Sequence, residues 1–252
     1  MEEHIIGGLS LSVLIYCVVA VFLAGLIRGY CGFGFSALTV ASVTLVLPPI
    51  EVIPFVMLLE IAASIGMLPA VWRSVDWRLV GWLFTGYAIG APFGIYALIN
   101  VPEEPVRIAI SVIILILSFA LLRGFVFKRA NHTSSILGTG VISGAINGVS
   151  AVGGLPVVLL MLANSATASV TRASIVAFLM LGDLYSTAIY SSSGLVAGDT
   201  LTRFAVLLVP LTIGVMIGSR QFVRSNPDSF KTLALWLLIA LACVGLLRIL
   251  VT

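Results

Sequence analysis

Arginine and asparagine stand beside glycines in two short runs of this chain, and these residue types suit an anion-binding site. The runs are GLIRGYCGFG, residues 25–34, and GAINGVSAVGG, residues 144–154. A shift of 119 residues pairs Gly25 with Gly144, Gly29 with Gly148, Gly34 with Gly153 and Arg28 with Asn147. Each run interrupts an apolar stretch. Paired interruptions at matching points of two halves are typical of the central binding site of a transporter.

Glycine lets the backbone turn sharply and present its N–H groups, and a helix restarting after each run directs its positive end at the same point. Arg28 adds a full positive charge, while Asn147 and Ser150 add neutral donors. We therefore expect an oxyanion ligand. The residues expected to bind it are Arg28, Gly29, Tyr30, Cys31, Gly32, Phe33, Gly34, Asn147, Gly148, Ser150, Gly153, Gly154 and Arg172.

Each of these assignments has a structural alternative. The glycines would also allow close helix packing, and Arg28 could extend to the membrane surface from a helix end. Arg172 fits either a cytoplasmic anchor or a second anion clamp. Glu60 and Asp183 are the acids deepest in apolar sequence. We expect them to take part in coupling or gating, with a helix-locking ion pair as the alternative.

The amino-acid composition indicates which kind of secondary structure must position these residues. Hydrophobic residues make up 60% of the 252-residue chain and charged residues 9%, whereas soluble domains carry about 25% charged residues. Long apolar stretches recur, and about 20 such residues cross a bilayer as a helix. They are Ser10–Ile27, Val52–Val71, Leu79–Ile99, Val106–Leu122, Ala173–Tyr190, Phe204–Ile217 and Leu233–Val251. The sequence predicts an all-α polytopic membrane protein.

We expect two repeats, residues 1–124 and 136–252, joined by a basic link at 125–135. A second shift, of 124 residues, pairs Gly90 with Gly214 and Gly94 with Gly218. Loops rich in arginine and lysine alternate with loops that carry acid. If the basic loops are cytoplasmic, both chain ends face the periplasm and the two repeats are inverted.

Each repeat is predicted to hold a re-entrant or broken-helix hairpin and three membrane-spanning helices. In the second repeat the arms Ile136–Ile146 and Leu155–Leu162 would be about 16 and 12 Å long, with Asn147–Gly154 at the tip. In the first repeat the arms are Ser10–Ile27 and Phe35–Leu47, with Arg28–Gly34 at the tip. The arm Ser10–Ile27 is long enough to cross the membrane, so re-entrance there is open.

No nucleophile–base pair, zinc-ligand spacing or phosphate-binding loop occurs in the sequence. We therefore expect no enzyme activity, no cofactor and no metal. The expected partners are a small anion and the lipid bilayer, together with a second copy of the chain as a homodimer; nucleic acid is not expected.

The chain resembles the sulfite exporter family TauE/SafE. The resemblance rests on GLIRGYCGFGFSALTV, SGAINGVSAVGGLPVVLLML, RSVDWRLVGWLFTGYAIGAPFG and the glycine-bearing helix Leu207–Arg220. It implies export of sulfite or organosulfonates such as sulfoacetate across the bacterial inner membrane. The first hairpin departs from the family pattern, because Phe33 and Phe35 flank Gly34 and no proline follows. These bulky rings are expected to narrow or line the site.

Together these features predict a transporter that works by alternating access and holds its anion between the two hairpin tips. An anion channel would share the tips. A membrane-embedded enzyme and a purely structural membrane subunit are the remaining alternatives.

Overall fold

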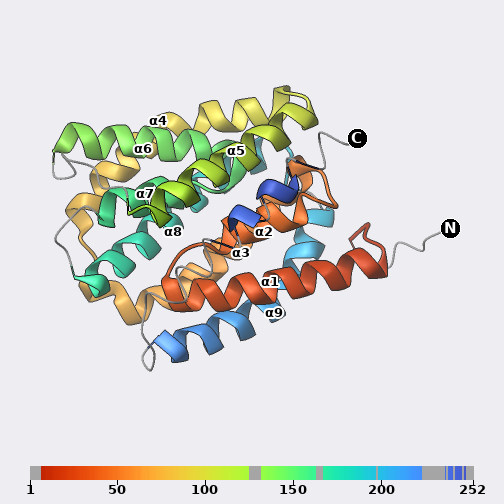
Figure 1. The fold of residues 1–252 in the computed structure, drawn as a ribbon, viewed down its shortest axis with the longest axis horizontal. Coiled ribbons are helices and arrows are strands. Elements are labelled where there is room, and N and C mark those ends of the chain that lie inside the picture. Colours follow the sequence, from red (N-terminus) through yellow and green to blue (C-terminus); the bar gives the residue numbers. More distant parts are fainter. Residues whose placement is uncertain are drawn as a thin grey trace.

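The computed structural model describes residues 7–124, 132–162, 167–196 and 198–222, with 236, 238–240, 242–245 and 247. Its described elements are helical (Figure 1). They are α1 (Leu11–Cys31), α2 (Phe35–Val43), α3 (Pro49–Val71), the short 3-10 helix η1 (Trp72–Ser74), α4 (Trp77–Asn100), α5 (Glu103–Leu122), α6 (Thr133–Ser150), α7 (Gly154–Leu162), α8 (Ala168–Ser192) and α9 (Gly198–Phe222).

Six of these helices are long and apolar enough to cross a membrane: α1, α3, α4, α5, α8 and α9. They correspond to the predicted apolar stretches as far as Phe204–Ile217. The seventh predicted stretch, Leu233–Val251, lies largely outside the described residues, as do residues 125–131 of the predicted link. The all-α polytopic prediction is thus confirmed in its coarse form.

The two hairpins are formed by α1 with α2 and by α6 with α7, and their tips are shorter than predicted. Helix α1 continues through Arg28 to Cys31, and α6 continues through Asn147 to Ser150. The first tip is therefore Gly32–Gly34 and the second tip Ala151–Gly153. Helix α6 has 18 residues, about 27 Å at 1.5 Å per residue. The prediction of a short first arm in the second hairpin is wrong, because the glycines of α6 lie within a continuous helix.

The ends of the first arms, at Gly32 and Ala151, are separated by the same 119 residues that relate the two glycine-rich runs. Helices α1 and α6 each end on a residue in the left-handed conformation, Gly32 with φ 82° and Ala151 with φ 56°. The following helices, α2 and α7, each have nine residues and begin at Phe35 and Gly154. The end of the first arm and the start of the second thus correspond in the two hairpins, although Gly34 has φ 94° and its counterpart Gly153 has no positive φ.

Glycines bring helices from different halves of the chain into close contact. In α4, a Cβ atom added at Gly90 or Gly94 would collide with the backbone of α6, at Val141 and Ala145. In α9, a Cβ atom at Gly218 would collide with the backbone of α1 at Leu26. Figure 1 shows α4 beside α6 and α1 beside α9 along their lengths. At these positions the glycines therefore allow close helix packing, which is the structural alternative given for them above.

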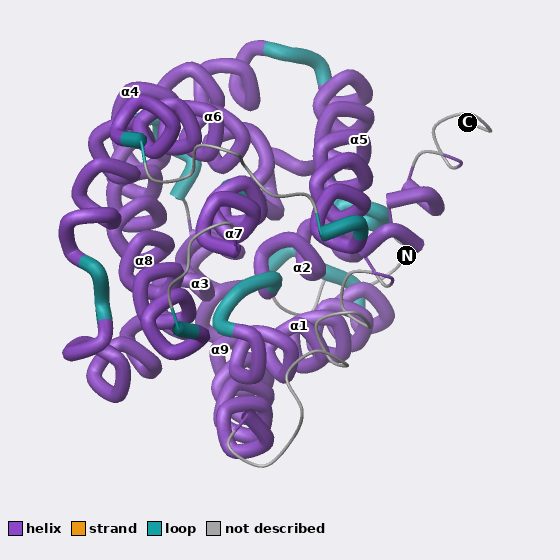
Figure 2. The backbone as a smooth tube through the Cα atoms, turned by 60° about the vertical axis from the view of Figure 1, so that its left-hand side comes forward, coloured by secondary structure: helices purple, strands orange, loops and turns teal. Residues whose placement is uncertain are grey.

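Residue order shows that both pairs are parallel. Gly86, Gly90 and Gly94 contact α6 at successively later positions, and Gly25 and Gly29 contact α9 in the same sense. Figure 2 shows the short helices α2 and α7 in the middle of the molecule, between these two pairs. Helices α3 and α8 pack against each other and complete the centre.

Polar contacts tie the loops together at each end of the molecule. At one end Arg203 of α9 binds Glu51 of α3 at 2.8 Å and the Gly7 carbonyl at 2.9 Å. At the other end the Asp76 N–H donates to the hydroxyl of Ser174, at the start of α8. The acidic residue Glu51 and the basic residues that flank Asp76 therefore lie at opposite ends, as the distribution of loop charges predicts.

Candidate functional site

The first buried polar cluster centres on Arg28, in the last turn of α1. Its side chain is fully buried and forms an ion pair with Glu60 of α3, with 2.9 Å between Nη1 and Oε1. Nη2 donates to the Ser64 hydroxyl at 2.7 Å, and Nη1 also donates to the Gly32 carbonyl. Arg28 therefore does not extend to a surface, and it joins the first tip to α3.

The second cluster centres on Asn147, in the last turn of α6. Its Nδ2 donates to Oδ1 of Asp183 at 2.9 Å and to the Tyr87 hydroxyl at 2.6 Å, while its Oδ1 accepts from the Gly153 N–H at 2.9 Å. The Tyr87 hydroxyl also shares a hydrogen bond with Ser186 at 2.7 Å. Asn147 thus joins the second tip to α8 and α4.

The same 119-residue shift relates the partners in the two clusters. It pairs Arg28 with Asn147 and, on the next full helix, Ser64 with Asp183. In both clusters the hairpin side chain donates to the equivalent residue of the next helix: Arg28 to Ser64, and Asn147 to Asp183. The position equivalent to Asp183 is Ser64, and Glu60 lies one helical turn before it on α3. The arginine of the first cluster therefore has a counter-ion on the same helix as Ser64.

The charges of the two clusters differ. Arg28 and Glu60 neutralise each other, which is the ion-pair alternative raised for Glu60. Asp183 is 2% exposed, and its Oδ2 has no hydrogen-bond partner. Glu60 and Arg28 are close enough to Asp183 to act on it electrostatically. Among the described residues, the two clusters together therefore contain one cation, Arg28, and two carboxyl groups, those of Glu60 and Asp183.

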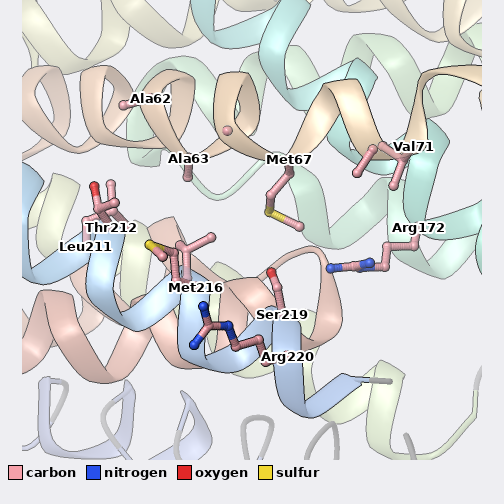
Figure 3. Close-up of a pocket in the computed structure, with 13 residues that line it drawn as sticks. Ala62, Ala63, Met67, Val71, Arg172, Leu211, Thr212, Met216, Ser219 and Arg220 are labelled. Atoms are coloured by element: carbon pink, nitrogen blue, oxygen red, sulfur yellow. The ribbon is translucent and has the colours of Figure 1, made fainter. Parts of the chain in front are cut away.

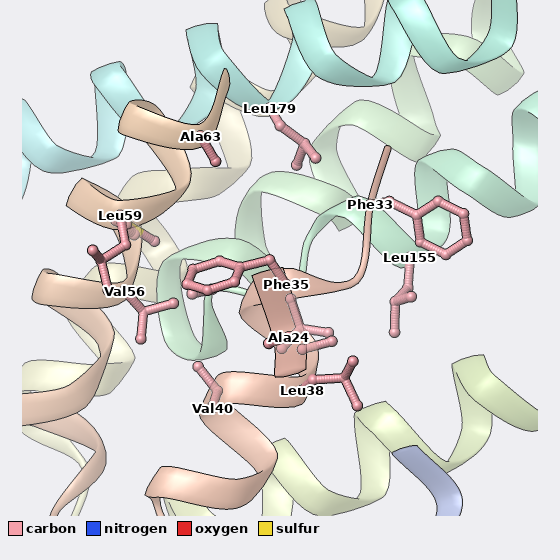
Figure 4. Close-up of a cluster of buried hydrophobic side chains, with 14 of the residues drawn as sticks. Ala24, Phe33, Phe35, Leu38, Val40, Val56, Leu59, Ala63, Leu155 and Leu179 are labelled. Atoms are coloured by element: carbon pink, nitrogen blue, oxygen red, sulfur yellow. The ribbon is translucent and has the colours of Figure 1, made fainter. Parts of the chain in front are cut away.

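The tips themselves are closely packed. Phe33 of the first tip and Leu155 of α7 belong to one buried apolar cluster (Figure 4). Phe35 is fully buried in the same cluster, directed toward α3. Phe35 is thus a core side chain in this structure, and the prediction that it narrows or lines the site stays a prediction. Tyr30 is buried, and the side chain of Cys31 lies outside the described residues.

The remaining glycines and Ser150 have local roles. Gly29 and Gly148 lie inside helices, where a Cβ atom would collide with Val215 of α9 or Ala91 of α4. Their carbonyls accept bonds from α8, Gly29 from Arg172 and Gly148 from Tyr190. The Ser150 hydroxyl donates to the carbonyl of its own helix at Ile146. Gly154 begins α7 and lies against Leu179, while the Gly153 carbonyl accepts from Ser143.

A cavity of about 440 Å³ lies between α3, α9 and the start of α8 (Figure 3). Of the predicted site residues only Arg172 lines it, together with Arg220, Ser219, Met67 and Met216 among others. The Arg172 side chain points into the cavity toward Ser219. Its Nη2 donates to the Gly29 carbonyl at 2.7 Å, and its stem packs on Gly32. The cavity thus reaches the first tip at Arg172.

Sequence reasoning missed Ser64, Tyr87, Tyr190 and Ser219. Ser64 was detectable, because the 119-residue shift pairs it with Asp183. The shift does not align Glu60 with Asp183, so the equivalence of the two acidic helices is visible only through Ser64. Tyr87, Tyr190 and Ser219 come from helices whose neighbours the sequence does not specify, and no local signal marks them.

A protein-family model described as sulfite exporter TauE/SafE matches residues 17–244 of the chain. The match spans both hairpins, both buried clusters and the cavity. Comparison with curated proteins gives no match, and comparison with solved structures gives none either.

Proposed function

The chain belongs to the sulfite exporter TauE/SafE family, and on that premise we propose that it exports small sulfur-containing anions, sulfite or organosulfonates such as sulfoacetate, across the bacterial inner membrane. The family is one of transporters, and the apolar helices make this chain a multi-pass membrane protein. The arginine-containing cavity that ends at the first hairpin tip is the observation that supports an anion as cargo.

The transport cycle we propose is alternating access between two inverted repeats, with both chain ends in the periplasm. The pairing of α1 with α9 supports it, since the equivalent helices α6 and α4 pair in the same way. Each glycine-packed pair joins a hairpin from one repeat to a full helix of the other. Rigid-body rocking of such units around a central site is the usual route to alternating access in inverted-repeat transporters.

In this cycle the anion first meets Arg172 and Arg220 in the cavity. Both guanidiniums suit a sulfonate or sulfite, because their planar forks donate in parallel to two oxygens. Arg220 is in the last turn of α9, where the basic loops begin, so the cavity opens toward the proposed cytoplasmic end. The anion then passes to the hairpin tips when Phe33 and Leu155 separate, and Asn147 lies directly behind the second tip.

Uptake of sulfite and of sulfoacetate into inside-out proteoliposomes tests the proposal. Wild-type protein should give saturable flux and counterflow. Arg172→Ala should lower flux at least tenfold, because the guanidinium both faces the cavity and holds the Gly29 carbonyl. Arg123→Ala is the matched control, since Arg123 is exposed directly after the end of α5 and its guanidinium lies over the ring of Phe119. Equal flux in both variants would contradict the assigned path.

Flux that neither saturates nor shows counterflow would favour the channel alternative, which shares these residues. The absence of flux and of anion binding in correctly folded protein would remove the transport proposal. The homodimer stays a prediction, and the mass of the protein in detergent measures it directly.

A further inference from the structure

The two buried acids at the centre of the molecule have different surroundings, and the difference separates their roles. Glu60 lies beside the guanidinium of Arg28. Asp183 receives one hydrogen bond, from the neutral amide of Asn147, and its Oδ2 receives none. A buried carboxylate without a counter-ion is unfavourable in a low-dielectric interior, so such a group is either paired or neutralised by a proton.

No described residue supplies Asp183 with a counter-ion of its own. The charged groups that face it are Glu60 on α3, which repels its charged form, and Arg28 on α1, which Glu60 already pairs. The nearby hydroxyl groups of Tyr87 on α4 and Tyr190 on α8 are neutral, and they are bonded to Asn147 and Ser186 and to the Gly148 carbonyl, respectively. Helix α7, which packs on α8, has no titratable residue.

Thr187 supports the same conclusion. It lies one turn after Asp183 on α8, so both side chains occupy one face of the helix. Its hydroxyl is also buried without a hydrogen-bond partner. A protonated Asp183 has an O–H to donate and a hydroxyl acceptor on its own face, whereas the ionised form has only acceptors.

We propose that Asp183 carries the coupling proton of this transporter, and that the proton and the anion bind together. With Asp183 ionised, the centre has one positive and two negative charges, and it repels an arriving anion. With Asp183 protonated, Arg28 and Glu60 cancel and the repulsion disappears. Glu60 is the fixed counter-ion of Arg28 in this scheme. The inference rests on the proposed anion transport.

Thermodynamic linkage makes the coupling reciprocal: if a proton strengthens anion binding, the anion strengthens proton binding by the same factor. Calorimetry of sulfoacetate binding between about pH 6 and about pH 8 measures this, since both acid groups of the ligand stay ionised there. In the wild type we expect up to about tenfold weaker binding per pH unit as the pH rises. Comparing buffers with different ionisation enthalpies should show uptake of up to one proton per anion. Absence of proton uptake in the wild type would overturn the proposal without any variant.

Variants then assign the proton to a residue. Asp183→Asn should bind sulfoacetate with no pH dependence, and Asp183→Glu, which restores a titrating group, should recover it. Glu60→Gln should keep a pH dependence because Asp183 is intact. If Asp183→Asn retains the wild-type pH dependence, or if sodium rather than protons is taken up with the anion, Asp183 is not the proton carrier.

An anion-independent readout separates this inference from the transport proposal. Infrared spectra of the wild type should contain the band of a protonated carboxyl group, and Asp183→Asn should lack it. If no anion binds but this band is present, the transport proposal fails and the protonated state of Asp183 stands. If anions bind and the band is absent from the wild type at about pH 6, the proton assignment fails by itself.

Discussion

Position 28 in the first hairpin and position 147 in the second lie in the same turn of helices related by the 119-residue shift. At position 28 a guanidinium reaches Glu60 and Ser64, and at position 147 an amide reaches Asp183 and Tyr87. The first cluster contains an ion pair between Arg28 and Glu60, whereas in the second the carboxyl group of Asp183 is bonded to a neutral amide; carboxyl oxygens of both Glu60 and Asp183 are buried without a hydrogen bond. Corresponding helix ends therefore hold a buried ion pair in one half and a carboxyl group bonded to a neutral amide in the other.

The sharpest way to break this comparison is to remove the counter-ion of the first cluster. Glu60→Ala leaves the guanidinium of Arg28 buried without a counter-charge, and we expect a loss of about 3–5 kcal/mol in the free energy of unfolding. The double variant Arg28→Met, Glu60→Leu should recover most of that loss, because no charge is then buried. Reversible unfolding in mixed micelles measures both. An unchanged stability of Glu60→Ala would mean that Arg28 does not depend on this pair.

The second cluster should be less sensitive, because its bonds involve neutral donors. Asn147→Ala removes the partner of Asp183, of the Tyr87 hydroxyl and of the Gly153 N–H, and we expect a loss of roughly 3 kcal/mol. The same unfolding measurement checks it. Thr85→Ala is the control, since that exposed hydroxyl bonds only to its own helix. A larger loss for Asn147→Ala than for Glu60→Ala would reverse the proposed ranking of the two clusters.

The glycine-packed pairs test whether the two halves are equivalent away from the polar clusters. Gly90→Ala and Gly214→Ala each place a methyl group against the backbone of the facing helix. We expect similar losses of about 1–3 kcal/mol. Gly81→Ala, on the exposed face of α4 with no atom within 4 Å, should instead stabilise the protein by up to about 1 kcal/mol. A clear difference between the losses for Gly90→Ala and Gly214→Ala would show that the two helix pairs contribute unequally to the free energy of unfolding.

The smallest effects are expected at the residues that end α1 and α6. Gly32→Ala introduces a side chain at φ 82°, beside the stem of Arg172, and should cost about 1–2 kcal/mol. Ala151→Gly relieves the same conformation at φ 56° and should stabilise the protein by about 1 kcal/mol. Thermal unfolding of the two variants gives the signs. Two losses would mean that Ala151 contributes through its methyl contacts rather than carrying backbone strain.

The sequence predicted the membrane-spanning helices well, because a hydrocarbon environment requires about 20 apolar residues for each crossing. It was less accurate at the hairpins. Glycine-rich sequence was interpreted as irregular backbone from Arg28 and Asn147 onward, although glycine also permits a helix to lie against another helix. The neighbouring helices α9 and α4 provide that packing, and they are distant in the sequence.

The candidate site was predicted in part for a similar reason. Arg28, Asn147, Glu60 and Asp183 were all identified, since polar residues in apolar sequence are conspicuous. Their partners were not. The roles of Ser64 and Tyr87 can be recognised only when α3 and α4 are placed against the hairpins, and the hydrogen bond from Arg172 to the Gly29 carbonyl joins residues that are distant in the sequence.

The sequence by itself determined that this chain is helical and membrane-spanning and that it resembles the family to which it belongs, and it predicts that the two halves correspond. Composition, periodicity and internal repetition carry that information along the chain. Only the tertiary structure decided which buried charges are neutralised. A charge is stabilised by whatever lies within a few ångströms of it, and here Arg28 pairs with Glu60 across two helices while Asp183 accepts its hydrogen bond from the neutral amide of Asn147.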